Sequence, residues 1–247
     1  MTPEERYKMM HASMIEPAGR IKDFVPEGSS LLEVGCSSGA LLGHLQKYDY
    51  DLYGSEWNAE DAAYLRDVGE IPCEEADVED IYPGKTFTAI VAMEVLEHQP
   101  DPIAFLRKLK DRLIGGGYLY LEIPNANNAL LTVYGIPEYK DFFYTEPHIT
   151  YWTPETLAAT LSSLGFESKV GTRQRYGLAN HLNWITHHEP TPDYKTATGY
   201  MNFVSKEHPL YAPMARLTGK LDKEYRIQLE TLKAADTIIA SCRRRSI

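Results

Sequence analysis

The stretch EVLEHQPDP places two carboxylates and an imidazole within a few residues of one another, and a second imidazole, His148, follows later in the chain. Glu94 and Glu97 are three residues apart and Glu94 and His98 four apart, so a helix beginning there would carry all three on one face. Oxygen ligands of this kind suit Mg²⁺ or Mn²⁺, which lower the pKa of a bound hydroxyl. We therefore predict a candidate metal site at Glu94, Glu97 and His98.

The same residues also allow a site without metal. In that alternative Glu97 caps a helix that begins near Asp101, and His98 lines a pocket. His98 or His148 is then the better candidate for a catalytic general base, because a neutral imidazole can take a hydroxyl proton near pH 7.

A glycine loop, Gly35-Cys36-Ser37-Ser38-Gly39, follows the short apolar run 30–34. Such a loop lets the backbone approach a ligand at the start of a helix. A dinucleotide fingerprint needs G-x-G-x-x-G, whereas Ser37 stands at the middle glycine position and no third glycine has the required spacing. Glu56, at the end of the next expected strand, can accept hydrogen bonds from both ribose hydroxyls of a nucleoside.

Alternating strands and helices must position these groups. We expect strands at 30–34, 51–56, 71–75, 87–93, 118–124, 167–175 and 237–242, and helices at 40–47, 103–113 and 153–164, with Gly115 to Gly117 ending the second helix. This order predicts an α/β fold with a seven-stranded, mostly parallel sheet, helices on both faces and a helical insertion before the last strand. Ligands of such sheets bind beyond the carboxyl ends of the strands, here at 35–39, Glu56, Asp77, 94–98 and 124–128.

Five segments in this order resemble the motifs of the class I S-adenosylmethionine-dependent methyltransferases: LLEVGCSSGALL, GSEWN, EEADVED, VAMEVLEHQPDP and GGGYLYLEIPN. The resemblance implies a Rossmann-like core and S-adenosyl-L-methionine as cofactor. By position, Gly35 and Gly39 would line the methionine part, Glu56 the ribose and Asp77 the adenine amino group. Ser37 departs from the commoner glycine. The remaining cofactor-binding residues that the resemblance implies are Glu33, Cys36, Ser37, Trp57, Val78, Met93 and Glu94.

Two later segments, EPHITYWTPETLAATLSSLGFE and RQRYGLANHLNWI, resemble a branch that methylates sugars and other small molecules. EVLEH followed by His148 also resembles the ubiquinone-pathway O-methyltransferases and the enzymes that methylate the 2′-hydroxyl at small-RNA 3′ ends. This resemblance implies a divalent cation held by Glu94, Glu97, His98 and His148. The resemblance implies methylation of an oxygen of a small hydroxylated metabolite, a sugar or sugar-phosphate-like compound of glycan or secondary metabolism.

Several alternatives stay open at this point. Within the class they are a metal-dependent RNA 2′-O-methyltransferase and an N- or C-methyltransferase of a small molecule. Outside it they are an NAD-dependent oxidoreductase and a non-catalytic nucleotide-binding module.

Composition bears on partners and location. The 35 acidic and 25 basic residues give a formal charge of −10, which disfavours nucleic acid and anionic membranes as partners, and the run Arg243 to Arg245 is interpreted as a solvated tail. The three cysteines fit no zinc or disulfide pattern, and no signal-like or membrane-spanning segment is evident. We expect a soluble cytoplasmic protein that takes a small-molecule acceptor, and the sequence leaves a homodimer open.

The expected domain organisation has four parts. Residues 1–29 form an N-terminal helical flap, 30–175 the S-adenosylmethionine-binding core, and 236–247 the last strand and tail. Residues 176–235 form a helical insertion that we interpret as a lid for the acceptor, rich in aromatic and histidine residues: Tyr176, His181, Trp184, His187, His188, Tyr194, Tyr200, Phe203, His208 and Tyr211.

Overall fold

The computed structural model describes residues 1–192, 197–199 and 206–246. Its contacts divide the chain into two compact units. The first unit comprises Met1–Glu122, Ala158–Lys169 and Ala240–Ile247, and the second comprises Ile123–Leu157 and Val170–Ile239. Among the helices of the described residues, none is long and apolar enough to cross a bilayer.

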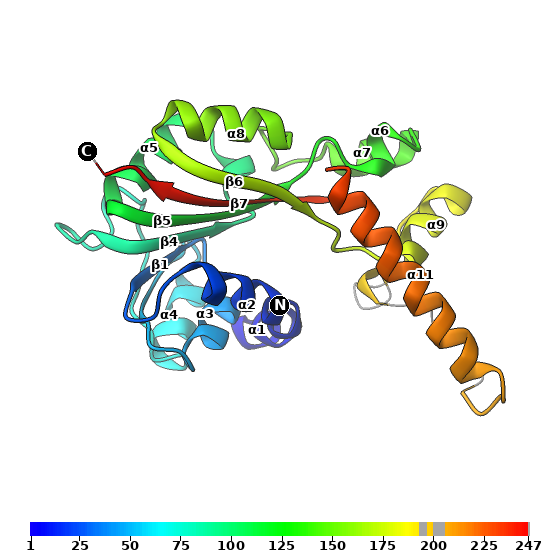
Figure 1. The fold of residues 1–247 in the computed structure, drawn as a ribbon. Helices are drawn as coiled ribbons and strands as arrows, with labels where there is room; N and C mark the ends of the chain where they lie inside the picture. The colour runs from blue at the N-terminus through cyan, green and yellow to red at the C-terminus, as the bar shows by residue number, and fades with distance from the viewer. Residues whose placement is uncertain (193–196, 200–205, 247) are drawn as a thin grey trace. The chain divides into compact units, whose positions relative to one another are not determined.

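A seven-stranded sheet has the order β3-β2-β1-β4-β5-β7-β6, with the last strand antiparallel to its neighbours (Figure 1). The predicted fold class is thereby confirmed. The strands are β1 Ser30–Val34, β2 Asp51–Ser55, β3 Cys73–Glu74, β4 Phe87–Met93, β5 Leu113–Pro124, β6 Phe166–Arg173 and β7 Thr237–Arg244.

In the first unit, strand register brings the predicted ligand-binding ends to one edge of the sheet. The parallel pairs include Val34 with Ser55, Val34 with Ala92, and Met93 with Glu122. Strand β1 lies in the middle of this set and is buried almost throughout, which explains its continuous apolar run. The loops after β1, β2 and β4 therefore leave the same edge.

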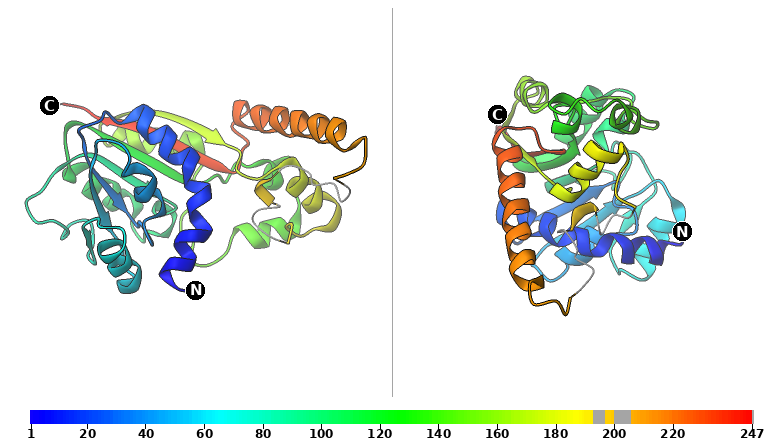
Figure 2. Two further views of the ribbon diagram at one scale, coloured as in Figure 1. Left: turned by 90° about the horizontal axis from the view of Figure 1, so that it is seen from below. Right: turned by 90° about the vertical axis from the view of Figure 1, so that its right-hand side faces the viewer.

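The first helix of the first unit is α1 Pro3–His11. Thr2 and Glu5 form a capping box at its N-terminus. A 3-10 turn, η1 Ala12–Met14, joins it to α2 Ile15–Phe24, and the chain changes direction between the two (Figure 2). The others are α3 Ala40–Leu45, α4 Ala59–Asp67, the 3-10 turn η2 Leu96–His98 and α5 Pro102–Arg112.

The N-terminal helices pack on the helices that follow the glycine loop. The ring centroids of His11 and His44 lie 3.9 Å apart, and Arg6 Nε lies 3.0 Å from a carboxylate oxygen of the buried Asp61. Burial, followed by the neighbouring His44, lowers the pKa of His11. That this segment closes over a cofactor as a flap stays a prediction.

A buried ion pair joins α2 to β5. Arg20 Nη2 donates to Glu122 Oε1 at 2.7 Å and Arg20 Nε donates to the Tyr120 hydroxyl at 2.9 Å, while that hydroxyl donates to Glu122 Oε1 at 2.5 Å. Burial by itself would lower the pKa of Arg20, but the charge of Glu122 raises it. The guanidinium is therefore the fixed counter-charge of a carboxylate that has no exposed surface.

The second unit contains α6 Ala129–Thr132, α7 Pro137–Phe143, α9 Leu178–His187 and α11 Tyr211–Thr231, and α8 Pro154–Ser163 passes from it into the first unit. The buried Asp236 accepts from the backbone N–H groups of Arg175 and Tyr176 and from Gln174 Nε2. Gln174 Nε2 also meets His181 Nε2 at 3.0 Å. This network joins the end of β6 to the beginning of β7 and to α9.

Two local expectations were wrong. Gly115 to Gly117 do not end a helix before a strand; they lie inside β5, which begins directly after α5. The C-terminal arginines are not a solvated tail, since β7 extends to Arg244, whose Nη1 donates to the Lys110 and Leu113 carbonyls. Three aromatic residues of the predicted lid, Tyr194, Tyr200 and Phe203, lie outside the described residues.

Candidate cofactor site

The glycine loop after β1 takes the conformation that its glycines allow. Gly35 and Gly39 have φ values of 73° and 81°, in the left-handed region, and Ser37 also has a positive φ of 49°. A Cβ at Gly39 would lie 2.3 Å from Leu65 Cδ1 and one at Gly35 would lie 2.6 Å from Val95 Cγ2. Both glycines are therefore required by backbone angle and by close packing.

Glu56 holds this loop from the neighbouring strand. Its Oε2 accepts from the Ser37 N–H at 2.8 Å, and its Oε1 accepts from the Asn58 N–H at 2.8 Å. Each carboxylate oxygen has two lone pairs, so both keep an acceptor position for a ribose hydroxyl. The structure thus joins the predicted glycine loop to the predicted ribose-binding acid. The contact is made by the backbone of Ser37, the residue that stands where the resembling motif more commonly has glycine.

The side chain of Cys36 faces the sheet. It is 4% exposed and its Sγ lies 3.7 Å from Cys73 Sγ. The hydrogen bond with Cys73, and then burial, raise the pKa of the Cys36 thiol well above its usual range. A ligand at this loop would therefore meet the backbone of Cys36, because the sulfur is already packed.

Glu33 is a buried carboxyl directly before the loop. It is 5% exposed, and burial, with the neighbouring Cys73 and Glu56, raises its pKa well above its usual range. Its Oε2 has no hydrogen-bond partner among the described residues. A polar atom in that position is available to a hydrogen-bond donor that enters from the loop side.

The predicted adenine-contacting residues lie further along the first unit. Asp77 Oδ1 accepts from the Val78 N–H at 2.6 Å, and Asp77 Oδ2 lies 3.4 Å from Lys108 Nζ. Val78 is buried, whereas Trp57, directly after the ribose acid, is 74% exposed. Trp57 thus offers an uncovered aromatic face beside Glu56, while Asp77 is partly engaged by a lysine.

The EVLEH stretch does not form the single helix face that residue spacing suggested. Glu94 directly follows β4 with a left-handed φ of 54°, and its N–H donates to the Glu122 carbonyl at 2.8 Å. Only the short turn η2 follows, and α5 has its own cap, because Asp101 Oδ1 accepts from the Ala104 N–H. Glu97 therefore caps no helix: it is 1% exposed, with Oε1 4.0 Å from His98 Nε2.

His148 belongs to the second unit, in the segment between α7 and α8, where its ring lies 6.0 Å from that of Tyr151. Glu97 and His98 are neighbours in the first unit, and the metal set that adds His148 stays a prediction. Within 124–128, Asn125 Nδ2 donates to the Ala235 carbonyl and Asn128 caps α6, and a ligand-binding role for this segment stays a prediction.

Sequence reasoning missed the pair of Arg20 and Glu122. The available signal was the acid inside the apolar strand 118–124, since a buried carboxylate requires a partner. Glu122 also accepts the Glu94 N–H through its backbone carbonyl, so the pair supports the turn that carries Glu94.

A family model described as "Methyltransferase domain" matches residues 10–169, which include every predicted cofactor residue as well as His98 and His148. The chain belongs to the class I S-adenosylmethionine-dependent methyltransferases.

Curated relatives fall into two groups. A "tRNA U34 carboxymethyltransferase" of Alteromonas mediterranea is 39% identical over 93 residues, 37% of this chain and 27% of the relative. A "Ubiquinone biosynthesis O-methyltransferase" of Xanthomonas axonopodis pv. citri is 28% identical over 167 residues, covering 58% of this chain and 64% of the relative. This chain therefore spans less than two thirds of either relative.

Solved structures share the fold. An S-adenosylmethionine-dependent methyltransferase from Archaeoglobus fulgidus matches with a TM-score of 0.61 at 16% identity, covering 98% of this chain and 97% of the other. The plantazolicin methyltransferase BpumL, solved with S-adenosylhomocysteine, matches with a TM-score of 0.55 at 14% identity, covering 97% and 84%. At sequence identities this low, the comparison with these two structures supports a shared fold and nothing about the substrate.

Proposed function

We propose that this chain transfers the methyl group of S-adenosyl-L-methionine to an oxygen of a small hydroxylated metabolite. The observation that carries the proposal is Glu56, which holds the glycine loop through Ser37 and keeps acceptor positions for a ribose. In a chain of this family, that arrangement supports cofactor binding at the loops after β1 and β2.

Methyl transfer needs alignment more than activation, since the sulfonium of the cofactor is already reactive. The acceptor oxygen attacks the methyl carbon in line with the carbon–sulfur bond, that bond breaks, and S-adenosylhomocysteine leaves. The hydroxyl proton must go to a base. We propose His98 and His148 for this role, since a neutral imidazole accepts a proton near pH 7.

The donor atoms at the EVLEH turn are also chemically suited to a divalent cation. Glu97 offers carboxylate oxygens beside the imidazole of His98, and hard ligands of this type fit Mg²⁺ or Mn²⁺. Glu94, Glu97, His98 and His148 would hold the ion. A bound cation would supply a Lewis acid that favours the ionised form of an acceptor hydroxyl.

A small acceptor is favoured over RNA by the distribution of positive charge. The chain has a formal charge of −10. In its basic C-terminal run, Arg244 donates to two carbonyls, Arg243 lies 5.0 Å from the ring centre of Tyr118, and Arg245 Nε lies 3.7 Å from Glu167 Oε1. Arginines engaged in this way offer little to a phosphate backbone.

The test has two stages. Calorimetry with S-adenosylhomocysteine and with NAD comes first, and we expect binding of the former alone; tight NAD binding without it would overturn the cofactor proposal. A screen of hydroxylated acceptors follows, with release of S-adenosylhomocysteine as the readout. His98→Ala and His148→Ala should each abolish turnover with cofactor affinity retained, whereas the exposed His187→Ala should leave both unchanged.

The metal is tested separately. If the ion is required, dialysis against a chelator should abolish turnover, and Mg²⁺ or Mn²⁺ should restore it. Full activity after such dialysis would exclude the metal and leave the histidines as bases.

A further inference from the structure

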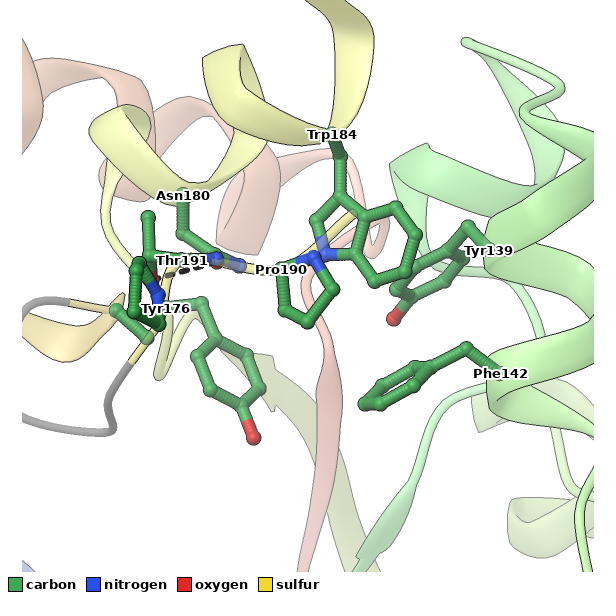
Figure 3. Close-up of a pocket in the computed structure, with 9 residues that line it drawn as sticks. Tyr139, Phe142, Tyr176, Asn180, Trp184, Pro190 and Thr191 are labelled. Carbon is green, nitrogen blue, oxygen red and sulfur yellow. Dashed lines mark hydrogen bonds between the residues drawn. The ribbon is translucent and has the colours of Figure 1, made fainter. Parts of the chain in front are cut away.

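A pocket of about 210 Å³ lies within the second unit, between α7, the start of α9 and the segment that follows α9. Figure 3 shows Tyr139, Phe142 and Trp184 on one side of it and Tyr176, Asn180 and Thr191 on the other. Its volume is below the range of about 300–1,000 Å³ that holds a drug-sized ligand, so it suits a single ring.

One wall of the pocket is aromatic. The ring centroids of Tyr139 and Trp184 lie 5.0 Å apart in an edge-to-face arrangement, and those of Phe142 and Trp184 lie 5.3 Å apart. Tyr139 and Trp184 are buried, whereas Phe142 is 54% exposed and stands at the rim. Fixed rings of this kind offer an apolar face against which another ring can stack.

The opposite wall presents oriented polar groups. Asn180 is 3% exposed, and its Oδ1 accepts from both the N–H and the hydroxyl of Thr191 at 3.1 Å. Its amide is thereby fixed, and within the described part of the chain its Nδ2 donates to no residue, so this group remains available as a donor. Burial raises the pKa of Tyr139 on the aromatic wall, which keeps its hydroxyl protonated.

None of the described residues that line the pocket carries a charge. A phosphate or carboxylate there would lose its hydration without gaining a counter-ion from these residues. A pyranose has apolar C–H groups on its faces and hydroxyls around its edge, which match the aromatic wall and the polar wall.

We propose that this pocket binds a sugar ring, and that the ring is an uncharged pyranose. The proposal rests on the proposed methyltransferase function and narrows its substrate class, since the phosphorylated sugars that the sequence left open do not fit these walls. An aromatic acceptor would use the rings but leave the Asn180 amide without a partner.

The experiment uses the full chain and methyl glycosides of glucose, galactose, mannose and N-acetylglucosamine, with binding followed by saturation-transfer NMR and by quenching of tryptophan emission. We expect at least one glycoside to bind. Phe142→Ala should weaken it by about tenfold, near the upper end for one aromatic contact. Trp184→Phe should retain the binding but remove the quenching. Ile185→Ala, which changes an exposed residue of α9 outside the pocket, should alter neither.

The controls separate this proposal from the proposed function. Phe142→Ala should bind S-adenosylhomocysteine as wild type does. If wild type binds S-adenosylhomocysteine but no glycoside, if phenol or glucose 6-phosphate binds in preference, or if Phe142→Ala has no effect, the pocket proposal is wrong. If S-adenosylhomocysteine does not bind, the proposed function fails, whereas glycoside binding that depends on Phe142 would still define a sugar site.

Discussion

Replacing Arg20 with alanine should destabilise the protein strongly, because it removes the counter-charge of a carboxylate with no exposed surface. Glu122 would keep the Tyr120 hydroxyl but lose the guanidinium 2.7 Å away. Breaking a buried ion pair from one side costs about 3–5 kcal/mol. The Arg20 side chain is 24% exposed, so solvent screening favours the lower end, about 3 kcal/mol. At about 2–4 °C per kcal/mol for a chain of this size, the melting temperature should fall by about 6–12 °C.

Thermal and urea unfolding followed by circular dichroism would measure this effect. Glu122→Gln and the double variant complete a cycle, and we expect a coupling free energy of about 2 kcal/mol between the two positions. The matched control is Glu16→Ala, which removes the other carboxylate bound by Arg20. Glu16 is 64% exposed, so its loss should cost about 0.5 kcal/mol or less. If Arg20→Ala is no less stable than Glu16→Ala, the ion pair of Arg20 and Glu122 does not stabilise the packing of α2 on the sheet.

Three further changes test other parts of the structure. Glu56→Gln should weaken S-adenosylhomocysteine binding by about 10-fold to 100-fold in calorimetry, as for a lost hydrogen bond to a charged group. Glu60→Gln, at an exposed position of α4, should leave it unchanged, and a loss under about twofold for Glu56→Gln would contradict the ribose role. Burial, and then Arg226, lower the pKa of His181 to about 4. Between that pH and about 6.5 the unfolded chain is protonated at His181 and the folded chain is not. The free energy of unfolding should therefore fall by about 3 kcal/mol as the pH drops from about 6.5 to about 4. His181→Gln should lack this fall, and an unchanged pH profile would refute the explanation. Gly39→Ala should reduce both stability and cofactor affinity because of its φ of 81° and the contact with Leu65, whereas Gly19→Ala, with open space in α2, should be neutral or stabilising; equal behaviour of the two would contradict the packing argument.

Structural features were predicted correctly where the sequence pattern is compatible with only one local structure. The segments 30–34 and 87–93 are mostly apolar, as expected of buried strands, and β1 and β4 have these same bounds. Gly35 and Gly39 could be identified because few other residues take left-handed backbone angles beside a packed neighbour.

Spacing alone was misleading where two structures share one pattern. Glu94, Glu97 and His98 have helical spacing, but they do not share one helix. Glu94 has a left-handed backbone conformation, and Glu97 and His98 lie in the 3-10 turn η2. Gly115 to Gly117 could end a helix or enter a strand, and pairing with β4 decides for the strand. The acid inside the apolar strand indicated that Glu122 needs a partner, but no pattern identified Arg20, which lies 102 residues earlier.

Glu56 links two loops, and we predict that it also faces the ribose of the cofactor. Its two oxygens hold the backbone at Ser37 and at Asn58. The hydrogen bonds that hold this loop geometry are therefore made within the protein itself. If Glu56 binds the ribose as predicted, a replacement that removes its carboxylate should weaken both the ribose contact and the two loop contacts. The predicted ribose contact and the structure of the two loops would then depend on the same carboxylate, that of Glu56.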